Sequence, residues 1–144
     1  LMGPLGLDGS AYFNTFVVSN DGATVYYQNG QGKLVAHTLA SGQEKVLYQD
    51  FQRVPNLRLS RDGSRLAVRS GGFLGVLNLA SGEMKQLYLR DFATDNNVMW
   101  GLEWTPDSKN VIVLASNWQS REQNWWIYPA EGGPRKVVPV NARI

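Results

Sequence analysis

Cysteine is absent from this sequence of 144 residues, and histidine occurs once, at His37. The lack of cysteine excludes disulfides, thiolate catalysis and cysteine-ligated metals. Lysine and arginine exceed aspartate and glutamate only narrowly, 14 against 12, and they are spread along the chain, so we expect no nucleic-acid partner. No apolar run approaches the roughly 18 residues of a membrane-spanning helix, so we also expect no membrane span.

A tight-turn motif occurs three times, as Asp21-Gly22, Asp62-Gly63 and Asp107-Ser108. Each copy lies between two runs of alternating apolar residues, which is the pattern of a β-hairpin. Glycine suits such turns because it adopts positive φ without steric cost. The Asp positions 21, 62 and 107 give spacings of 41 and 45 residues. Repeats of this length predict stacked structural units.

Each repeat contains four short strand-like segments and no helical pattern. The expected strands are 14–19, 23–28, 33–39, 43–48, 54–60, 64–69, 73–79, 83–88, 99–105, 109–115, 124–129 and 135–140. Four strands in about forty residues are typical of one blade of a β-propeller. We therefore predict an all-β fold with a lead-in at 1–10, blades at 11–50, 51–91 and 92–140, and a tail at 141–144.

The motif residues also resemble a known family. Ser60 to Val68, Trp104 to Lys109 and Trp126 to Lys136 are similar to the TolB-type, WD-like propeller repeat. Asn20 and Arg61 replace the usual proline of that repeat, and Ser108 replaces its glycine. The resemblance implies a periplasmic or other extracytoplasmic location. The family includes binding proteins and propellers fused to peptidases, amidohydrolases or kinases.

Three blades are too few to close a ring, because propellers have typically 4–8 blades. Each blade buries its faces on its neighbours, so an isolated stack exposes two end faces. We expect these faces to include Phe16, Val25, Leu34, Val111, Ile112 and Val113. Either the chain is part of a longer propeller, or two copies pair as a homodimer into a ring of six blades. The dimer is favoured because an isolated chain must cover its ends.

Strand parity assigns the turns to two rims. The turn rim carries the repeated tight turns, for which a structural role is expected at Asp21, Gly22, Asp62, Gly63 and Asp107. The linker rim carries the variable segments, including an expanded turn at 116–123. Variable loops on a rigid scaffold usually carry function. The candidate binding residues are therefore Asp95, Asn96, Asn97, Trp118, Arg121 and Gln123.

Several alternatives remain for these residues. Trp118 either binds a partner or packs over its own loop, and an exposed Trp could also stack on a sugar ring. His37 has no triad or second metal ligand around it, so a structural role is expected. The basic set Arg58, Arg61, Arg65 and Arg69 is expected to form a solvated face.

The sequence thus predicts a non-catalytic module for protein or ligand binding, with no cofactor and no metal. Its partner is a second copy, the blades of a parent chain, another protein or a glycan. The alternative is a substrate-gating propeller of a larger hydrolase or peptidase.

Overall fold

The computed structural model describes residues 16–51 and 55–140, so the lead-in at 1–10 and the tail at 141–144 lie outside the described residues. Within this part the chain forms twelve strands and no helix. Blade 1 contains β1 (Phe16–Val18), β2 (Thr24–Gln28), β3 (Leu34–Thr38) and β4 (Glu44–Tyr48). Blade 2 contains β5 (Asn56–Leu59), β6 (Arg65–Ser70), β7 (Phe73–Asn78) and β8 (Met84–Leu89). Blade 3 contains β9 (Asn97–Trp104), β10 (Asn110–Asn117), β11 (Gln123–Pro129) and β12 (Lys136–Pro139).

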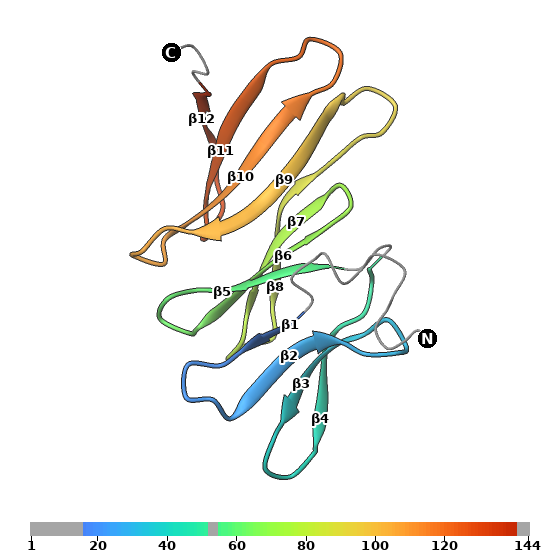
Figure 1. Cartoon of the computed structure of the whole chain (residues 1–144), viewed down its shortest axis with the longest axis vertical. Coiled ribbons are helices and arrows are strands. Elements are labelled where there is room, and N and C mark those ends of the chain that lie inside the picture. The colour runs from blue at the N-terminus through green and yellow to red at the C-terminus, as the bar shows by residue number, and fades with distance from the viewer. Residues whose placement is uncertain (1–15, 52–54, 141–144) are drawn as a thin grey trace.

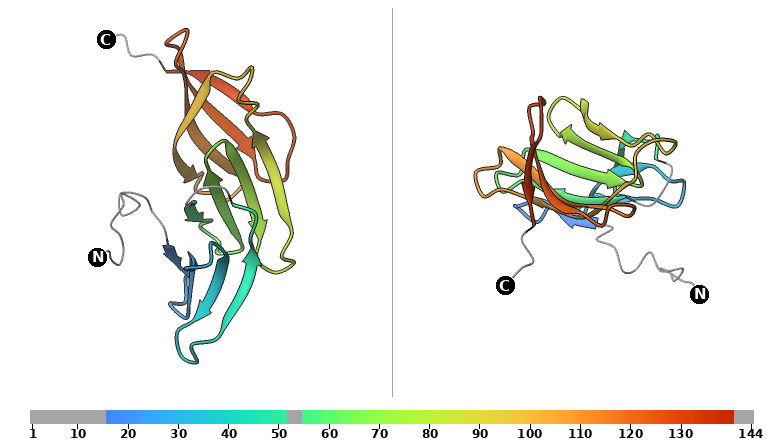
Figure 2. Two further views of the ribbon diagram at one scale, coloured as in Figure 1. Left: turned by 90° about the vertical axis from the view of Figure 1, so that its right-hand side faces the viewer. Right: turned by 90° about the horizontal axis from the view of Figure 1, so that it is seen from above.

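The three blades are separate antiparallel sheets in which the strands follow sequence order. Blade 2 lies between the other two, and blades 1 and 3 form the opposite ends of the stack (Figure 1). The first strands of the blades are neighbours, because β5 contacts both β1 and β9. Two further views show the same open stack (Figure 2). The all-β fold with three four-stranded propeller blades is therefore confirmed.

The repeated turns form because one carboxylate closes each hairpin. Oδ1 of Asp62 accepts hydrogen bonds from the hydroxyl of Ser60 at 2.7 Å and from the backbone N–H of Ser64 at 3.0 Å. Gly63 follows at φ +77°, and an added Cβ there would lie 2.9 Å from Nδ2 of Asn20. The backbone angle thus favours glycine at this position, and a larger residue would also have to displace the side-chain amide of Asn20 in blade 1.

Junction 2/3, between blades 2 and 3, holds the larger core. Its centre is Trp104, which is 2% exposed and packs with Ala67, Val76 and Val111. The indole Nε1–H of Trp104 donates to the backbone carbonyl of Arg58 at 2.9 Å, which satisfies the polar end of the ring. A buried aromatic with a paired N–H therefore joins the two sheets.

Junction 1/2, between blades 1 and 2, is purely aliphatic at its fully buried centre. Leu34, Leu57, Leu66 and Leu77 are each 0% exposed there. Partly buried side chains surround them, namely Val17, Tyr26, Leu47, Tyr48, Phe51, Leu59, Leu79 and Met84. Each junction thus buries one face of each of its two sheets, as stacked repeats require.

The expected composition of the end faces is wrong in part. Phe16 is 57% exposed on the outward face of blade 1, and Ile112 is half-buried on the outward face of blade 3. Leu34, however, faces blade 2, and Val111 and Val113 are buried in junction 2/3. The reason is the period of two in a strand, which puts Val111 and Val113 on the face opposite to Ile112.

The solvated face expected of Arg58, Arg61, Arg65 and Arg69 is wrong in part, because Arg61 is exposed but Arg58 and Arg69 are half-buried against blade 3. Nε of Arg58 donates to the carbonyl of Leu102 at 3.1 Å, and Nε of Arg69 donates to that of Gly101 at 2.9 Å. Burial lowers the pKa of Arg69. These long side chains instead bridge blade 2 to the backbone of β9, because guanidinium N–H groups reach across the junction.

In the part of the chain that the structure describes, no helix has the length and apolar character needed to cross a membrane.

Candidate functional site

The linker between blades 2 and 3 and the β10–β11 turn are held together at the linker rim. Nδ2 of Asn96 donates to Oε1 of Gln119 at 2.5 Å, and the backbone N–H of Trp118 donates to the carbonyl of Asn96 at 3.1 Å. The indole of Trp118 remains 59% exposed. Two segments that are distant in sequence therefore form one surface that displays Trp118, which we call the Trp118 surface (residues 95–97 and 117–121).

Asp95 and Asn97 support this surface rather than project from it, whereas Arg121 is exposed on it. Asp95 accepts hydrogen bonds from the Tyr88 hydroxyl and, at 2.9 Å, from the backbone N–H of Asn97. Burial raises the pKa of Asp95, but the hydrogen bonds from Tyr88 and Asn97 outweigh it, so the net pKa is lowered. Asn97 is already part of β9 and pairs with Asn117 of β10. Asp95 is thus an ionised anchor for the linker.

The expanded turn predicted at 116–123 is shorter than expected. β10 continues to Asn117 and β11 begins at Gln123, so Gln123 lies in a strand and donates to the hydroxyl of Ser116 at 3.2 Å. The extra length of this hairpin arises because two alternating strands simply extend further than in the other blades. Gln123 is therefore a strand residue beside the turn.

The β10–β11 turn on the linker rim has the same hydrogen-bond pattern as the β7–β8 turn on the turn rim. Oδ1 of Asn117 accepts from the N–H groups of Gln119 and Ser120 at 3.0 and 2.9 Å. Oδ1 of Asn78 accepts in the same way from two N–H groups in the β7–β8 turn, at 3.0 Å each. Arg121 then takes the position of Gly82, with φ +69° against +78°. A long cationic side chain is therefore held in a backbone conformation that favours glycine.

The Asp residues of the turn rim each close one hairpin. Oδ1 of Asp21 accepts from the Ser19 hydroxyl at 2.6 Å, and Oδ1 of Asp107 accepts from the Thr105 hydroxyl at 2.6 Å. Gly22 has φ +75° next to Asp21. Among residues 16–51 and 55–140, no group of three or more His, Cys, Asp and Glu side chains is arranged to hold a metal. Each carboxylate is thus used by its own turn.

Neighbouring Asp turns are also bonded across the blades. Nδ2 of Asn20 donates to the carbonyl of Arg61 at 3.1 Å, and the hydroxyl of Ser108 accepts from the N–H of Asp62 at 3.1 Å. Asn20 and Ser108 are two of the positions where the sequence departs from the TolB-type pattern. Both departures therefore supply an inter-blade hydrogen bond.

His37 lies on the outward face of blade 1 in a small polar group. Nδ1 of His37 is 2.8 Å from Oε2 of Glu44, and the hydroxyl of Tyr27 donates to the same oxygen. The bond from Tyr27 and then the one from His37 lower the pKa of Glu44. The group is exposed at an end of the stack, next to Phe16 and Val18.

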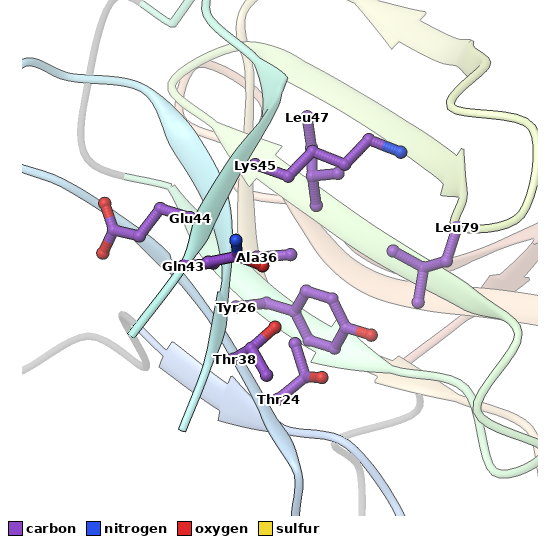
Figure 3. A pocket seen from close by; sticks show the side chains of 9 residues that line it. All are labelled: Thr24, Tyr26, Ala36, Thr38, Gln43, Glu44, Lys45, Leu47 and Leu79. Carbon is purple, nitrogen blue, oxygen red and sulfur yellow. The ribbon is translucent and has the colours of Figure 1, made fainter. Parts of the chain in front are cut away.

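A cleft of about 620 Å³ opens at junction 1/2 on the turn rim. Figure 3 shows Tyr26 and Lys45 reaching toward it from blade 1 and Leu79 from blade 2, whereas the side chain of Glu44 points away. The lining residues are Thr24, Tyr26, Ala36, Thr38, Gln43, Glu44, Lys45, Leu47 and Leu79. The lining is mainly polar, and Ala36, Leu47 and Leu79 form its apolar part, so the cleft suits a polar ligand more than an apolar one.

The equivalent position at junction 2/3 is closed. There Arg65, which corresponds to Thr24 in the repeat, forms an ion pair with Glu131 of the β11–β12 turn. The side chain of Lys85, which corresponds to Lys45, lies over Gly132, with its Cδ 3.2 Å from the place of a Cβ. At junction 1/2 the pair Arg65–Glu131 is replaced by Thr24 and Ala80. The short side chains leave the cleft open.

Sequence reasoning missed this cleft because it assigned function to the linker rim alone. The signal was nevertheless present in the aligned repeats. At equivalent turn-rim positions, Arg65 is long and charged whereas Thr24 is short, and Glu131 is replaced by Ala80.

The comparisons with known proteins support the fold and no particular family. No family model matches the sequence, and no curated protein matches it. Among solved structures, Kuenenia stuttgartiensis hydrazine synthase aligns with a TM-score of 0.61 at 19% identity, over 87% of this chain and 37% of its own. The extracellular domain of a candidate one-component system, BT4673 of B. thetaiotaomicron, aligns with a TM-score of 0.62 at 18% identity, over 95% of this chain and 17% of its own.

A third similar structure is the dipeptidyl peptidase 4 of Porphyromonas gingivalis. It aligns with a TM-score of 0.67 at 12% identity, over 89% of this chain and 26% of its own. The chain thus spans between 17% and 37% of the length of these three structures. At such identities the likeness shows a shared propeller-type fold and leaves the TolB-type assignment as a prediction.

Proposed function

We propose that this chain is a non-catalytic β-propeller module that serves as an interaction scaffold and completes its ring with a second copy of itself. The observation that carries the proposal is the outward face of blade 3, which has the apolar character of a face buried inside the stack. Leu114 pairs with both Trp100 and Trp125 across three strands of this face. Trp100 is 55% exposed and Trp125 is 41% exposed.

The equivalent positions in blade 2 indicate what kind of surface covers this face. Trp125, Ile112 and Ile127 occupy the positions that Leu74, Ala67 and Val76 occupy in blade 2, where blade 3 buries them. Burying each large apolar side chain contributes roughly 1.5–3 kcal/mol. Another blade is therefore the cover that matches this face.

The complementary face is the outward face of blade 1. Phe16 stands at the position of Leu57, which is 0% exposed in junction 1/2. Charge also matches at the outermost strands, since β12 of blade 3 carries Lys136 and β4 of blade 1 carries Glu44. Among residues 16–51 and 55–140, neither end face has a neighbouring blade, and a second copy would provide one for each in a closed two-fold ring of six blades.

Light scattering across a dilution series tests this ring. We expect a mass of twice the 16.0 kDa of one chain. Trp125→Glu is expected to give a monomer because it places a charge in the apolar face. Trp118→Glu on the linker rim is the matched control and is expected to leave the dimer intact. A wild-type monomer at all concentrations would overturn the ring of two copies and favour the blades of a longer chain.

A charge exchange tests the register of the two faces. Lys136→Glu and Glu44→Lys are each expected to weaken the dimer, whereas the two substitutions together restore it. If the double variant is as weak as the single ones, the two side chains do not meet and the proposed stacking is wrong.

Within this scaffold we assign protein binding to the Trp118 surface. It combines an exposed Trp with amide side chains, and Trp is the residue type most enriched at binding hot spots. An extracytoplasmic location fits both the TolB-type resemblance and the similarity to an extracellular domain. A photoreactive phenylalanine analogue at position 118 is expected to form a cross-linked adduct in the source cells. The same analogue at Ser41 on the turn rim serves as the control, and equal labelling at both positions would contradict the assignment.

A substrate-gating role is the second candidate function. It is supported by the similarity in fold to a dipeptidyl peptidase, of which the chain covers 26%. The test is the parent reading frame, since gating requires a catalytic domain in the same polypeptide.

A further inference from the structure

The cleft at junction 1/2 contains polar groups that the fold itself does not use. Lys45 forms no ion pair among the described residues, and the side-chain oxygens of Thr24, Tyr26 and Thr38 have no hydrogen-bond partner in the same part of the chain. Three hydroxyl groups and one ammonium group therefore line the same concave space (Figure 3).

The nearby carboxylates are directed elsewhere. Glu44 lines the cleft, but its side chain points away from it (Figure 3), and its carboxylate accepts from Tyr27 and pairs with His37 on the other face of the sheet. The carboxylate of Asp21 is used by Ser19 and Ala23. Lys45 is thus the charge that the cleft presents.

Tyr26 is a hydrogen-bond donor in this setting. Burial, followed by the charge of Asp21, raises the pKa of its phenol, so the hydroxyl keeps its proton at neutral pH. The side chains of Ala36, Leu47 and Leu79 also line the cleft and give it an apolar part. A ligand for this site needs one negative group, several hydroxyls and an apolar face.

We propose that the cleft between blades 1 and 2 binds a small hydroxylated carboxylate, such as a sugar acid. Its carboxylate would accept a charge-assisted hydrogen bond from Nζ of Lys45, and its hydroxyls would bond the hydroxyls of Thr24, Thr38 and Tyr26. The carbon face of the ring would lie on Leu79 and Leu47. The site lies within one chain, so it depends neither on ring closure nor on the Trp118 surface.

Junction 2/3 shows how the corresponding space is closed within the same chain. At junction 2/3 the ion pair of Arg65 and Glu131 occupies the corresponding space. The double substitution Thr24→Arg with Ala80→Glu transplants this pair to junction 1/2. We expect it to fill the cleft in a folded protein, because the same two side chains already join blades 2 and 3.

The experiment is an amide chemical-shift titration with D-glucuronate, and with D-glucose as the neutral match. Glucuronate is expected to shift the amide signals of residues 24, 36, 38 and 45, and glucose to shift them much less. Lys45→Met is expected to weaken binding roughly ten- to a hundred-fold, the value of one hydrogen bond to a charged group. Lys85→Met, at the closed junction, is the matched control and is expected to leave binding unchanged.

Three results would overturn the proposal. The first is the absence of any shift with glucuronate at tens of millimolar. The second is equal binding of glucose and glucuronate, which would remove the role of the carboxylate. The third is undiminished binding by the folded Thr24→Arg, Ala80→Glu variant, which would place the ligand elsewhere.

Discussion

The hydroxyl of Ser108 accepts a hydrogen bond from the backbone N–H of Asp62 at 3.1 Å, and so joins the turns of two successive blades. Ser108 has φ +62° and is 8% exposed. The residue thus combines a backbone angle that favours glycine with a side chain that glycine lacks. Its conformational cost is offset by the bond across the junction.

Substitutions at this position separate the two effects. Ser108→Ala keeps the unfavourable angle and leaves the N–H of Asp62 without its partner, so we expect a loss of about 1–3 kcal/mol in the free energy of unfolding. Ser108→Gly loses the same bond but relieves about 1 kcal/mol of backbone strain, so it should be the milder variant. Urea denaturation of both variants measures the difference. If alanine is as stable as glycine, strain at Ser108 is refuted.

Arg121 offers a stabilising substitution. Because its φ of +69° matches that of glycine at Gly82, Arg121→Gly should raise the free energy of unfolding by about 1 kcal/mol. The reciprocal variant, Gly82→Arg, should lower it by a similar amount. Thermal unfolding provides the measurement. A destabilised Arg121→Gly protein would show that the arginine side chain holds the turn through its own contacts.

Two tryptophans should differ sharply in their contribution to stability. Trp104→Phe removes the donor to the Arg58 carbonyl and leaves a void in junction 2/3, at a cost of about 2–4 kcal/mol. Trp118→Phe, at a side chain that is 59% exposed, should change stability by no more than about 0.5 kcal/mol. Chemical denaturation of the Trp104→Phe and Trp118→Phe variants measures the two changes in the free energy of unfolding. A large loss at Trp118 would support packing over its own loop.

The turn aspartates should make the protein acid-sensitive. The N–H of Ser64 and the hydroxyl of Ser60 lower the pKa of Asp62 below its ordinary value of 3.8. A carboxyl with a lowered folded pKa stabilises the fold above its unfolded pKa, and this contribution is lost as the pH falls through the folded pKa. Stability should therefore decline from about pH 4 downward, and less steeply in Asp62→Asn. Urea midpoints along the pH series test this, and identical slopes for both proteins would contradict it.

The local part of the fold was readable from the sequence because its signals are local. The Asp-Gly turns and the alternating strands predict three similar blades, and the structure has them. Alternation does not say which of its two faces meets the neighbouring blade. For this reason Leu34, Val111 and Val113 were expected on the ends of the stack, but they lie in its junctions.

The candidate sites depend on contacts between distant segments, which residue patterns do not encode directly. The bond of Asn96 to Gln119 draws the linker and the β10–β11 turn into one surface, although 23 residues separate them. The cleft at junction 1/2 arises from two small residues, Thr24 and Ala80, where the other junction has an ion pair. Only a comparison of equivalent positions between repeats could have indicated it.

The inter-blade bonds of the turn rim are not equally distributed. The turn of blade 2 accepts a bond from Asn20 on one side and donates one to Ser108 on the other. Blades 1 and 3 each have such a turn-to-turn hydrogen bond on one side only. Blade 2 is bonded on both sides within one chain, whereas blades 1 and 3 would each depend on the proposed second copy for their other side, so amide protons of blade 2 should exchange with solvent most slowly. The middle blade would then be the part of the chain that opens last and from which refolding spreads outward.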